Sequence, residues 1–167
     1  LETIKSVSIL CLEAYRKGRK TLLAGNGGSA ADSQHLSAEL IGRFSTSRRP
    51  LRSVALTTDS SALTCIANDF DFESVFSRQV EALLGPRDVL VALSTSGESK
   101  NIVGALQMAK ESGASTVALL GKGGGAAAEV ADHLLIVGSD STARIQETHL
   151  LIGHILCEII ERELGFD

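Results

Sequence analysis

Residues 22–29, which read Leu-Leu-Ala-Gly-Asn-Gly-Gly-Ser, decide the fold class of this chain. A short aliphatic run passes into a loop of glycine and serine, and a helical pattern over residues 30–41 follows. The glycines let the backbone turn tightly and approach a ligand, while the new helix N-terminus presents free N–H groups to an anion. The alternative is a tight strand-to-helix turn that binds nothing.

The loop does not match the two common nucleotide-binding motifs. No Gly-Lys-Ser or Gly-Lys-Thr follows it, which excludes a Walker A loop. Ala30 interrupts the dinucleotide-binding glycine pattern, and no acidic residue ends the second strand. A nucleotide-binding enzyme is therefore the least favoured class.

Four more aliphatic runs repeat the pattern along the chain. The five runs are Thr21–Ala24, Ser53–Leu56, Val89–Leu93, Thr116–Leu120 and Leu134–Val137, and they alternate with helical patterns at residues 1–17, 30–41, 73–84, 100–111, 126–131 and 142–164. Parallel strands that are buried on both faces read as short aliphatic runs. We therefore predict an α/β fold, a doubly wound parallel sheet of five strands with helices on both faces.

The composition is that of one globular domain, which we expect to span residues 1–167. Of these residues, 44% are hydrophobic and 22% are charged, and the net charge of −4 comes without a basic stripe, which argues against nucleic-acid binding. The apolar runs are too short to cross a membrane. Cys11, Cys65 and Cys157 lie far apart, which favours free thiols and a cytoplasmic location. No signal-peptide pattern is present, although the chain begins at Leu1 and a preceding targeting segment stays open.

A second loop, residues 94–99, reads Ser-Thr-Ser-Gly-Glu-Ser and stands between the third run and a helix that begins at Lys100. Its four hydroxyl groups can donate to phosphate oxygens beside backbone N–H groups. A helix needs one hydroxyl cap, so four exceed the structural requirement and favour phosphate binding over capping. Glu98 would have to point away from a bound phosphate.

His35 and Glu39 lie four residues apart and share one face of the helix over residues 30–41. Such a pair can hold one metal ion or act on one substrate. The two residues alone favour the simpler alternative, which is a surface hydrogen bond.

The last predicted helix, residues 142–164, carries Gln146, His149 and His154 among aliphatic residues. Polar groups in such a helix need partners: His149 is interpreted as a packed, hydrogen-bonded histidine, and His154 needs a carboxylate or a metal if it is more than a satisfied core residue. The helix's aliphatic side chains nearly encircle it, which predicts burial on more than one side and subunit packing. These side chains are Leu150, Leu151, Ile152, Ile155, Leu156, Ile159 and Ile160.

Residues 68–70, Asn-Asp-Phe, follow an apolar stretch, and Asp59 before that stretch is predicted to be a helix N-cap. Asp69 could accept hydrogen bonds from sugar hydroxyls or cap a turn.

Taken in order, these motifs resemble the phosphoheptose isomerase family of the sugar isomerase (SIS) domain group. The resemblance covers nearly the whole chain from about Lys20 onward. It rests on residues 25–29 with His35 and Glu39, then 68–70, then 94–97 with Ser99, then 144–147 (Arg-Ile-Gln-Glu) with His149 and His154.

The resemblance implies an SIS-type, flavodoxin-like domain with an N-terminal helix at residues 1–18, the sheet and its crossover helices at 20–137 and a C-terminal helix at 142–164. It implies interconversion of sedoheptulose 7-phosphate and D-glycero-D-manno-heptose 7-phosphate, the entry step to bacterial heptoses for lipopolysaccharide or surface glycans. It also implies a zinc ion and a homotetramer with active sites between subunits.

The resemblance also assigns roles to residues. The metal positions are His35, Glu39, Gln146 and His154, with Glu39 and His154 as the acid–base pair. The substrate-binding residues are Asn26, Gly27, Gly28, Glu39, Asn68, Asp69, Ser94, Thr95, Ser96, Ser99 and Gln146. Because Gln146 and His154 stand eight residues apart, about 12 Å along an ideal helix, one metal can accept both only through long side chains, helix distortion or different subunits.

Two positions depart from the family pattern. Some members have an acidic residue where this chain has Ala143, and many have Asn where Glu98 stands. The first departure predicts the loss of one substrate contact, and the second predicts either weaker phosphate binding or a solvated Glu98. The rival hypotheses are a non-catalytic SIS-domain protein that binds a replication initiator and a sugar-phosphate-sensing regulator. His154, together with His35 and Glu39, favours the enzyme.

Overall fold

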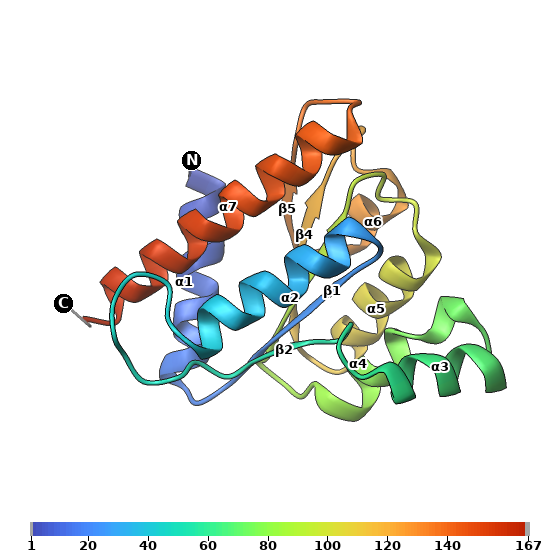
Figure 1. The fold of residues 1–167 in the computed structure, drawn as a ribbon, viewed down its shortest axis with the longest axis horizontal. Coiled ribbons are helices and arrows are strands. Elements are labelled where there is room, and N and C mark those ends of the chain that lie inside the picture. The colour runs from blue at the N-terminus through green and yellow to red at the C-terminus, as the bar shows by residue number, and fades with distance from the viewer. Residues whose placement is uncertain (1, 166–167) are drawn as a thin grey trace.

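A computed structural model describes residues 2–165 of the chain and gives a three-layer α/β/α arrangement (Figure 1). In chain order the elements are α1 (Glu2–Arg16), β1 (Thr21–Gly25), α2 (Gly28–Ile41), β2 (Ser53–Ala55), α3 (Ser60–Asp69), the short 3-10 helix η1 (Phe72–Ser74), α4 (Ser77–Leu83), β3 (Val89–Ser94), α5 (Lys100–Glu111), β4 (Ser115–Leu120), α6 (Gly125–Val130), β5 (His133–Ile136) and α7 (Thr142–Glu163).

The five strands form one parallel sheet in the order β2-β1-β3-β4-β5. This confirms the predicted doubly wound α/β fold. Side chains alternate across the sheet: Leu23 packs into a core with α1, α2 and α7, whereas Leu22 packs into a second core with α4, α5 and α6. The helices therefore cover both faces.

The topology places both predicted ligand loops at one edge of the sheet. The chain leaves β1 for β2 on one side and reaches β3 on the other, so the order reverses between β1 and β3. In open α/β sheets, ligands bind at the carboxyl ends of the strands at such a reversal. The loops that follow β1 and β3 are residues 26–27 and 95–99, and they flank this point.

The region between β2 and β3 differs from the prediction. The helix expected at residues 73–84 is divided, because Asp71 caps a single 3-10 turn by accepting from the Ser74 N–H at 2.6 Å and α4 begins only at Ser77. For α3 the sequence analysis predicted the N-cap at Asp59 but no bounds; its apolar side chains Leu63 and Ile66 pack against the core and are only partly buried. Its predicted N-cap is confirmed, since the Asp59 carboxylate accepts from the Ala62 N–H at 2.9 Å.

The prediction that α7 is buried on more than one side through subunit packing stays a prediction, because a single chain covers α7 only in part. Ile152, Leu156 and Ile160 are buried against the sheet and α1, but Leu151 is 59% exposed. Ile155 and Ile159 line an open groove beside α1. Over the described residues, no helix is long and apolar enough to cross a membrane.

Candidate active site

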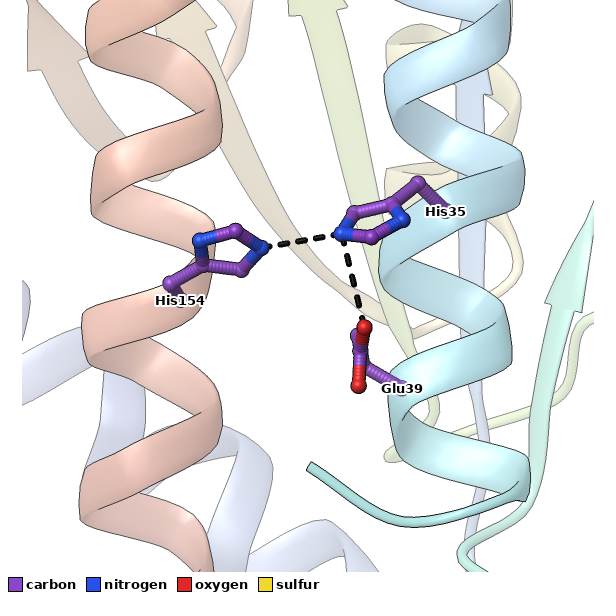
Figure 2. Close-up of side chains that lie close together, drawn as sticks. All are labelled: His35, Glu39 and His154. Atoms are coloured by element: carbon purple, nitrogen blue, oxygen red, sulfur yellow. Dashed lines mark hydrogen bonds and ion pairs between the residues drawn. The ribbon is translucent and has the colours of Figure 1, made fainter. Parts of the chain in front are cut away.

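Three side chains from two helices meet at the surface of the α2–α7 layer (Figure 2). His35 and Glu39 extend from α2, and His154 extends from α7. The Nε2 atoms of the two histidines lie 2.9 Å apart, and His35 Nε2 lies 3.4 Å from a Glu39 carboxylate oxygen. One ligand atom from each of the three residues falls within 4.8 Å of the others. We call these three residues the triad.

The triad depends on a close approach of α2 and α7. Gly153, next to His154, faces Leu36, next to His35; a Cβ at position 153 would lie 2.4 Å from a Leu36 methyl carbon. Leu36 is itself buried in the core between the sheet and these helices. A glycine at this position therefore lets the two helices bring their histidines into contact.

The surroundings of the triad hold the rings but leave them accessible. The His35 and His154 rings meet edge to face, with centroids 5.2 Å apart, and the Phe44 ring lies 5.4 Å from the His154 ring. The His35 side chain is 46% exposed and that of Glu39 is 23% exposed. A ligand can therefore reach the triad from solvent.

Two imidazoles and one carboxylate are a donor set that suits a divalent transition metal. Their mutual distances, all within 4.8 Å, allow the three side chains to approach one ion. The triad is therefore compatible with a metal.

Gln146 lies elsewhere on α7 in this chain. Its side-chain amide packs on Gly28, the first residue of α2, so closely that a Cβ at position 28 would overlap it. Eight residues separate it from His154, or about 12 Å of helix rise. Gln146 is thus placed beside the loop after β1, and its role as a metal ligand stays a prediction.

The loops after β1 and β3 enclose a small polar cavity of about 60 Å³. It is lined by Asn26, Ser29, Leu93, Ser94, Thr95, Ser96 and Ser99. Gly27 has a left-handed backbone (φ +54°), which explains a glycine at the turn into α2. The cavity lies where the N-termini of α2 and α5 converge, so backbone N–H groups and hydroxyls surround it.

Within the second loop, two of the four hydroxyls accept backbone hydrogen bonds. The Ser94 hydroxyl oxygen accepts from the Gly97 N–H at 3.0 Å, and that of Ser96 accepts from the Glu98 N–H at 3.2 Å. Ser99 is the N-cap of α5, yet its hydroxyl makes no capping hydrogen bond. Among the described residues the Thr95 hydroxyl has no hydrogen-bond partner either, so Thr95 and Ser99 line the cavity with hydroxyls available to a ligand.

Comparison with known proteins places these features in one family. Residues 1–121 match the SIS domain family model. The chain is 54% identical to a phosphoheptose isomerase of Sulfurimonas denitrificans, over all of this chain and 86% of that protein. It is 55% identical to that of a Geobacter species, over 96% of this chain and 84% of that protein.

Solved structures agree with the sequence comparison. A phosphoheptose isomerase from Neisseria gonorrhoeae superposes with a TM-score of 0.92 at 45% identity, over 97% of this chain and 86% of that one. The enzyme from Francisella tularensis gives a TM-score of 0.94 at 36% identity, over 96% and 86% of the two chains. This chain belongs to the phosphoheptose isomerase family.

Against the family's expected site, Asn68 and Asp69 stand apart in this single chain. They end the exposed helix α3, where the Asn68 amide and the Cys65 thiol donate to the Asp69 carboxylate. These bonds lower the pKa of Asp69. Neither residue lines the loop cavity, so their contact with a substrate stays a prediction.

Glu98, where many family members have Asn, is directed away from the loop cavity. Its carboxylate lies beside Gly125 at the start of α6 and does not line the cavity. The expectation that this like charge points away from a phosphate site is therefore met. His149 is also confirmed as a packed histidine: it is fully buried, and its Nε2 lies 3.1 Å from the Leu120 carbonyl oxygen.

Sequence reasoning missed two residues that lie next to the site: Asn101, beside the first loop, and Asp32, beside His35. Asn101 exchanges two amide hydrogen bonds with Asn26, at 2.8 and 3.0 Å, and so fixes the first loop against α5. Asp32, one turn before His35, has a buried carboxylate oxygen with no hydrogen-bond partner in residues 2–165. Burial raises the pKa of Asp32, and nearby His35 opposes that rise. The i, i+3 spacing of Asp32 and His35 was a signal available in the sequence.

Proposed function

We propose that this chain is an isomerase that interconverts sedoheptulose 7-phosphate and D-glycero-D-manno-heptose 7-phosphate, the first step of bacterial heptose biosynthesis for lipopolysaccharide or other surface glycans. The observation that carries the proposal is the meeting of His35, Glu39 and His154 in a chain more than half identical to phosphoheptose isomerases. A non-catalytic binding role is not favoured, because it needs no such triad.

The reaction moves a proton between C1 and C2 of the sugar through a cis-enediolate. It needs a base at the carbon-bound proton, an acid for the carbonyl oxygen, and stabilisation of negative charge. In the proposed direction, Glu39 removes the proton from C1 of the ketose while His154 gives a proton to the C2 oxygen. Glu39 then returns its proton to C2, and His154 takes back a proton from the C1 oxygen, which yields the aldehyde.

We propose zinc as the metal, held by His35, Glu39 and His154. Gln146 would be the fourth ligand from another subunit, because within one chain it lies about 12 Å along α7 from His154. A bound zinc ion supplies Lewis-acid polarisation of the substrate oxygens. Two imidazoles and a carboxylate are a common zinc donor set. A carboxylate that binds a metal loses basicity, and an imidazole nitrogen that binds a metal carries no proton. The metal-binding and proton-transfer roles therefore compete at both Glu39 and His154.

The loop cavity is proposed to hold the phosphate. The Thr95 and Ser99 hydroxyls and the N–H groups at the start of α5 donate to its oxygens, together with Ser94, Ser96, Asn26, Gly27 and Gly28. Ser29 at the cavity and His35 in the triad are six residues apart on α2, about 9 Å of helix rise. That separation favours a sugar whose phosphate and reacting carbons lie at opposite ends.

The assembly is proposed to be a homotetramer of one-domain subunits with the active sites between them. Two uncovered surfaces support subunit packing: α3, which has no fully buried residue, and Leu151 on α7. Packing of a second subunit there would give Asn68 and Asp69 a route to the substrate. Free Cys11, Cys65 and Cys157 support a cytoplasmic location.

The direct test is turnover of sedoheptulose 7-phosphate by the purified protein, with the heptose product followed in a coupled assay. We expect turnover that a chelator removes and added zinc restores. A protein that has been reconstituted with zinc and still forms no heptose 7-phosphate would contradict the proposal.

A further inference from the structure

A buried carboxylate on α7 organises the loop that leaves α2. The Glu161 side chain is 3% exposed and lies next to residues 44–48. It accepts the backbone N–H groups of Phe44, Ser45 and Thr46 at 2.9 to 3.0 Å. It also accepts the hydroxyls of Ser45 and Thr46, and Arg48 Nε at 2.7 Å. These donors of the loop thus converge on one side chain.

Arg48 extends the same network to α2. Its guanidinium is fully buried, and besides Glu161 it donates to the Glu39 carbonyl oxygen at 2.7 Å and the Leu40 carbonyl oxygen at 2.8 Å. These carbonyls belong to the last turn of α2, where helix C-termini leave acceptors unpaired. Arg48 therefore ties the end of α2 to Glu161 on α7. We call Glu161 and Arg48 the clamp.

The clamp stands directly behind the triad. Glu161 follows His154 by seven residues, two helical turns, so both project from the same side of α7. The carbonyl that Arg48 binds on α2 belongs to Glu39, a member of the triad. The loop that Glu161 holds carries Phe44, whose ring packs against the His154 ring at 5.4 Å.

We propose that Glu161 and Arg48 are positioning residues for the triad, which set the spacing of α2 and α7 and hold Phe44 against His154. The inference deepens the proposed function and rests on it, because its purpose is to fix three metal ligands. Partners behind metal ligands commonly tune metal affinity by ten- to a hundred-fold, although they touch no metal. Buried ionic groups fix one packing arrangement in some proteins, and the bonds of Arg48 to both α2 and Glu161 suit that role here.

The Glu161 carboxylate of the clamp stays ionised near neutral pH. Burial alone would raise the pKa of Glu161, but the N–H groups of Phe44, Ser45 and Thr46 outweigh it and lower the pKa to about 2. The network is therefore constant near neutral pH, and its effect is geometric.

The test compares Glu161→Gln and Arg48→Lys with wild type as metal-free proteins titrated with Co²⁺, which is followed by its visible absorption, and with Zn²⁺ in competition. Glu161→Gln replaces one accepting oxygen with an amide N–H₂ group, which faces the N–H donors of the loop. Arg48→Lys introduces a single ammonium, which cannot reach Glu161 on α7 and the carbonyls of α2 together. We expect both variants to bind Co²⁺ about ten- to a hundred-fold more weakly, with an altered absorption spectrum.

A matched control separates positioning from general stability. Asp88 is also a buried carboxylate: it accepts the N–H groups of Lys20 and Gly85 and pairs with the Lys20 ammonium, and it lies at the opposite ends of β1 and β3. Asp88→Asn should lower the melting temperature as Glu161→Gln does, but leave Co²⁺ affinity at the wild-type value. Equal Co²⁺ affinity in Glu161→Gln, Arg48→Lys and wild type would overturn the proposal.

Two further measurements keep the result decisive. If Glu161→Gln does not fold, Arg48→Lys and Phe44→Leu carry the same expectation, because the first removes the guanidinium bridge without changing the charge and the second removes the ring contact. Imidazole nitrogen shifts of His35 and His154 in metal-free protein should change in the clamp variants and stay fixed in Asp88→Asn. Wild type that binds Co²⁺ but does not isomerise would remove the proposed function and leave the clamp in place. Unchanged shifts would overturn the clamp.

Discussion

The loop cavity and the triad are built in opposite ways. The cavity is made by two short stretches, each continuous in sequence, at the ends of adjacent strands β1 and β3. The triad joins His35 to His154, 119 residues apart, through the packing of α2 against α7. A loop site depends on local turns, whereas the triad depends on helix spacing. Changes at the triad or its packing should therefore affect the protein more than changes at a single loop hydroxyl.

The largest expected effect is that of Glu39→Gln, which alters the triad and leaves the loop cavity intact. Removal of the carboxylate takes away the proposed base and a metal ligand, so kcat should fall by about 10²- to 10⁴-fold. The oligomeric state should be unchanged, because glutamine has nearly the same side-chain shape as glutamate. Steady-state kinetics measure kcat, and size-exclusion chromatography measures the oligomeric state. Glu158→Gln, an exposed carboxylate on the same α7 as His154, is the control, and near-normal turnover of Glu39→Gln would remove Glu39 from the mechanism.

The next largest effect tests the helix spacing alone. Gly153→Ala adds one methyl group against buried Leu36, which should destabilise the fold by about 1–3 kcal/mol and weaken metal binding at the triad. Urea unfolding and a Co²⁺ titration measure these changes. Gly104→Ala is a matched control within a helix, because a Cβ at position 104 would lie 3.9 Å from its nearest atom, the Ser77 Cβ. This variant should gain up to about 1 kcal/mol in its free energy of unfolding. Unchanged metal affinity in Gly153→Ala would separate the triad from the α2–α7 contact.

The same contrast explains what the sequence could predict. The strands, both loops and the α/β fold were predicted from aliphatic runs and from the glycines between them, which are local signals. His35 and Glu39 looked like a surface pair by themselves, and only the family resemblance joined them to His154. Asn101, Arg48 and Glu161 gave no signal, because their roles depend on contacts with residues 75 to 117 positions away or with the end of a neighbouring helix. Tertiary packing decides such roles, and one sequence does not display it.

His149 lies on α7 between the two regions and provides a smaller, pH-dependent effect. Burial lowers its pKa below the usual 6.5, although the bond to the Leu120 carbonyl opposes this. A folded-state pKa below the unfolded value means that full stability is present above pH 6.5 and is lost as pH falls toward the folded pKa. The loss should reach at most about 1.4 kcal/mol per pH unit.

Urea unfolding between pH 7.5 and 5.5 measures this loss. His149→Gln removes the titrating group and places an amide N–H near the Nε2 position that faces the Leu120 carbonyl, so its stability should vary less with pH over this range. Glu161 does not interfere, because its folded pKa of about 2 and its unfolded value of 4.5 lie below this range. Identical pH dependence in wild type and His149→Gln would show that folding does not lower the pKa of His149.

Ser99→Ala is expected to have the smallest effect, and it tests whether the second loop binds substrate without taking part in the reaction. Its hydroxyl caps nothing in α5, so its loss should spare the fold and remove one donor from the phosphate. One hydrogen bond to a charged group corresponds to about a ten-fold rise in KM with kcat nearly unchanged, because the phosphate does not react. Ser112→Ala, at the other end of α5, is the control; its hydroxyl donates to the Met108 carbonyl and lies outside the loop cavity. Should Ser99→Ala lower kcat as much as Glu39→Gln does, the division between a binding loop and a reacting triad would be wrong, and the two regions would act as one catalytic unit.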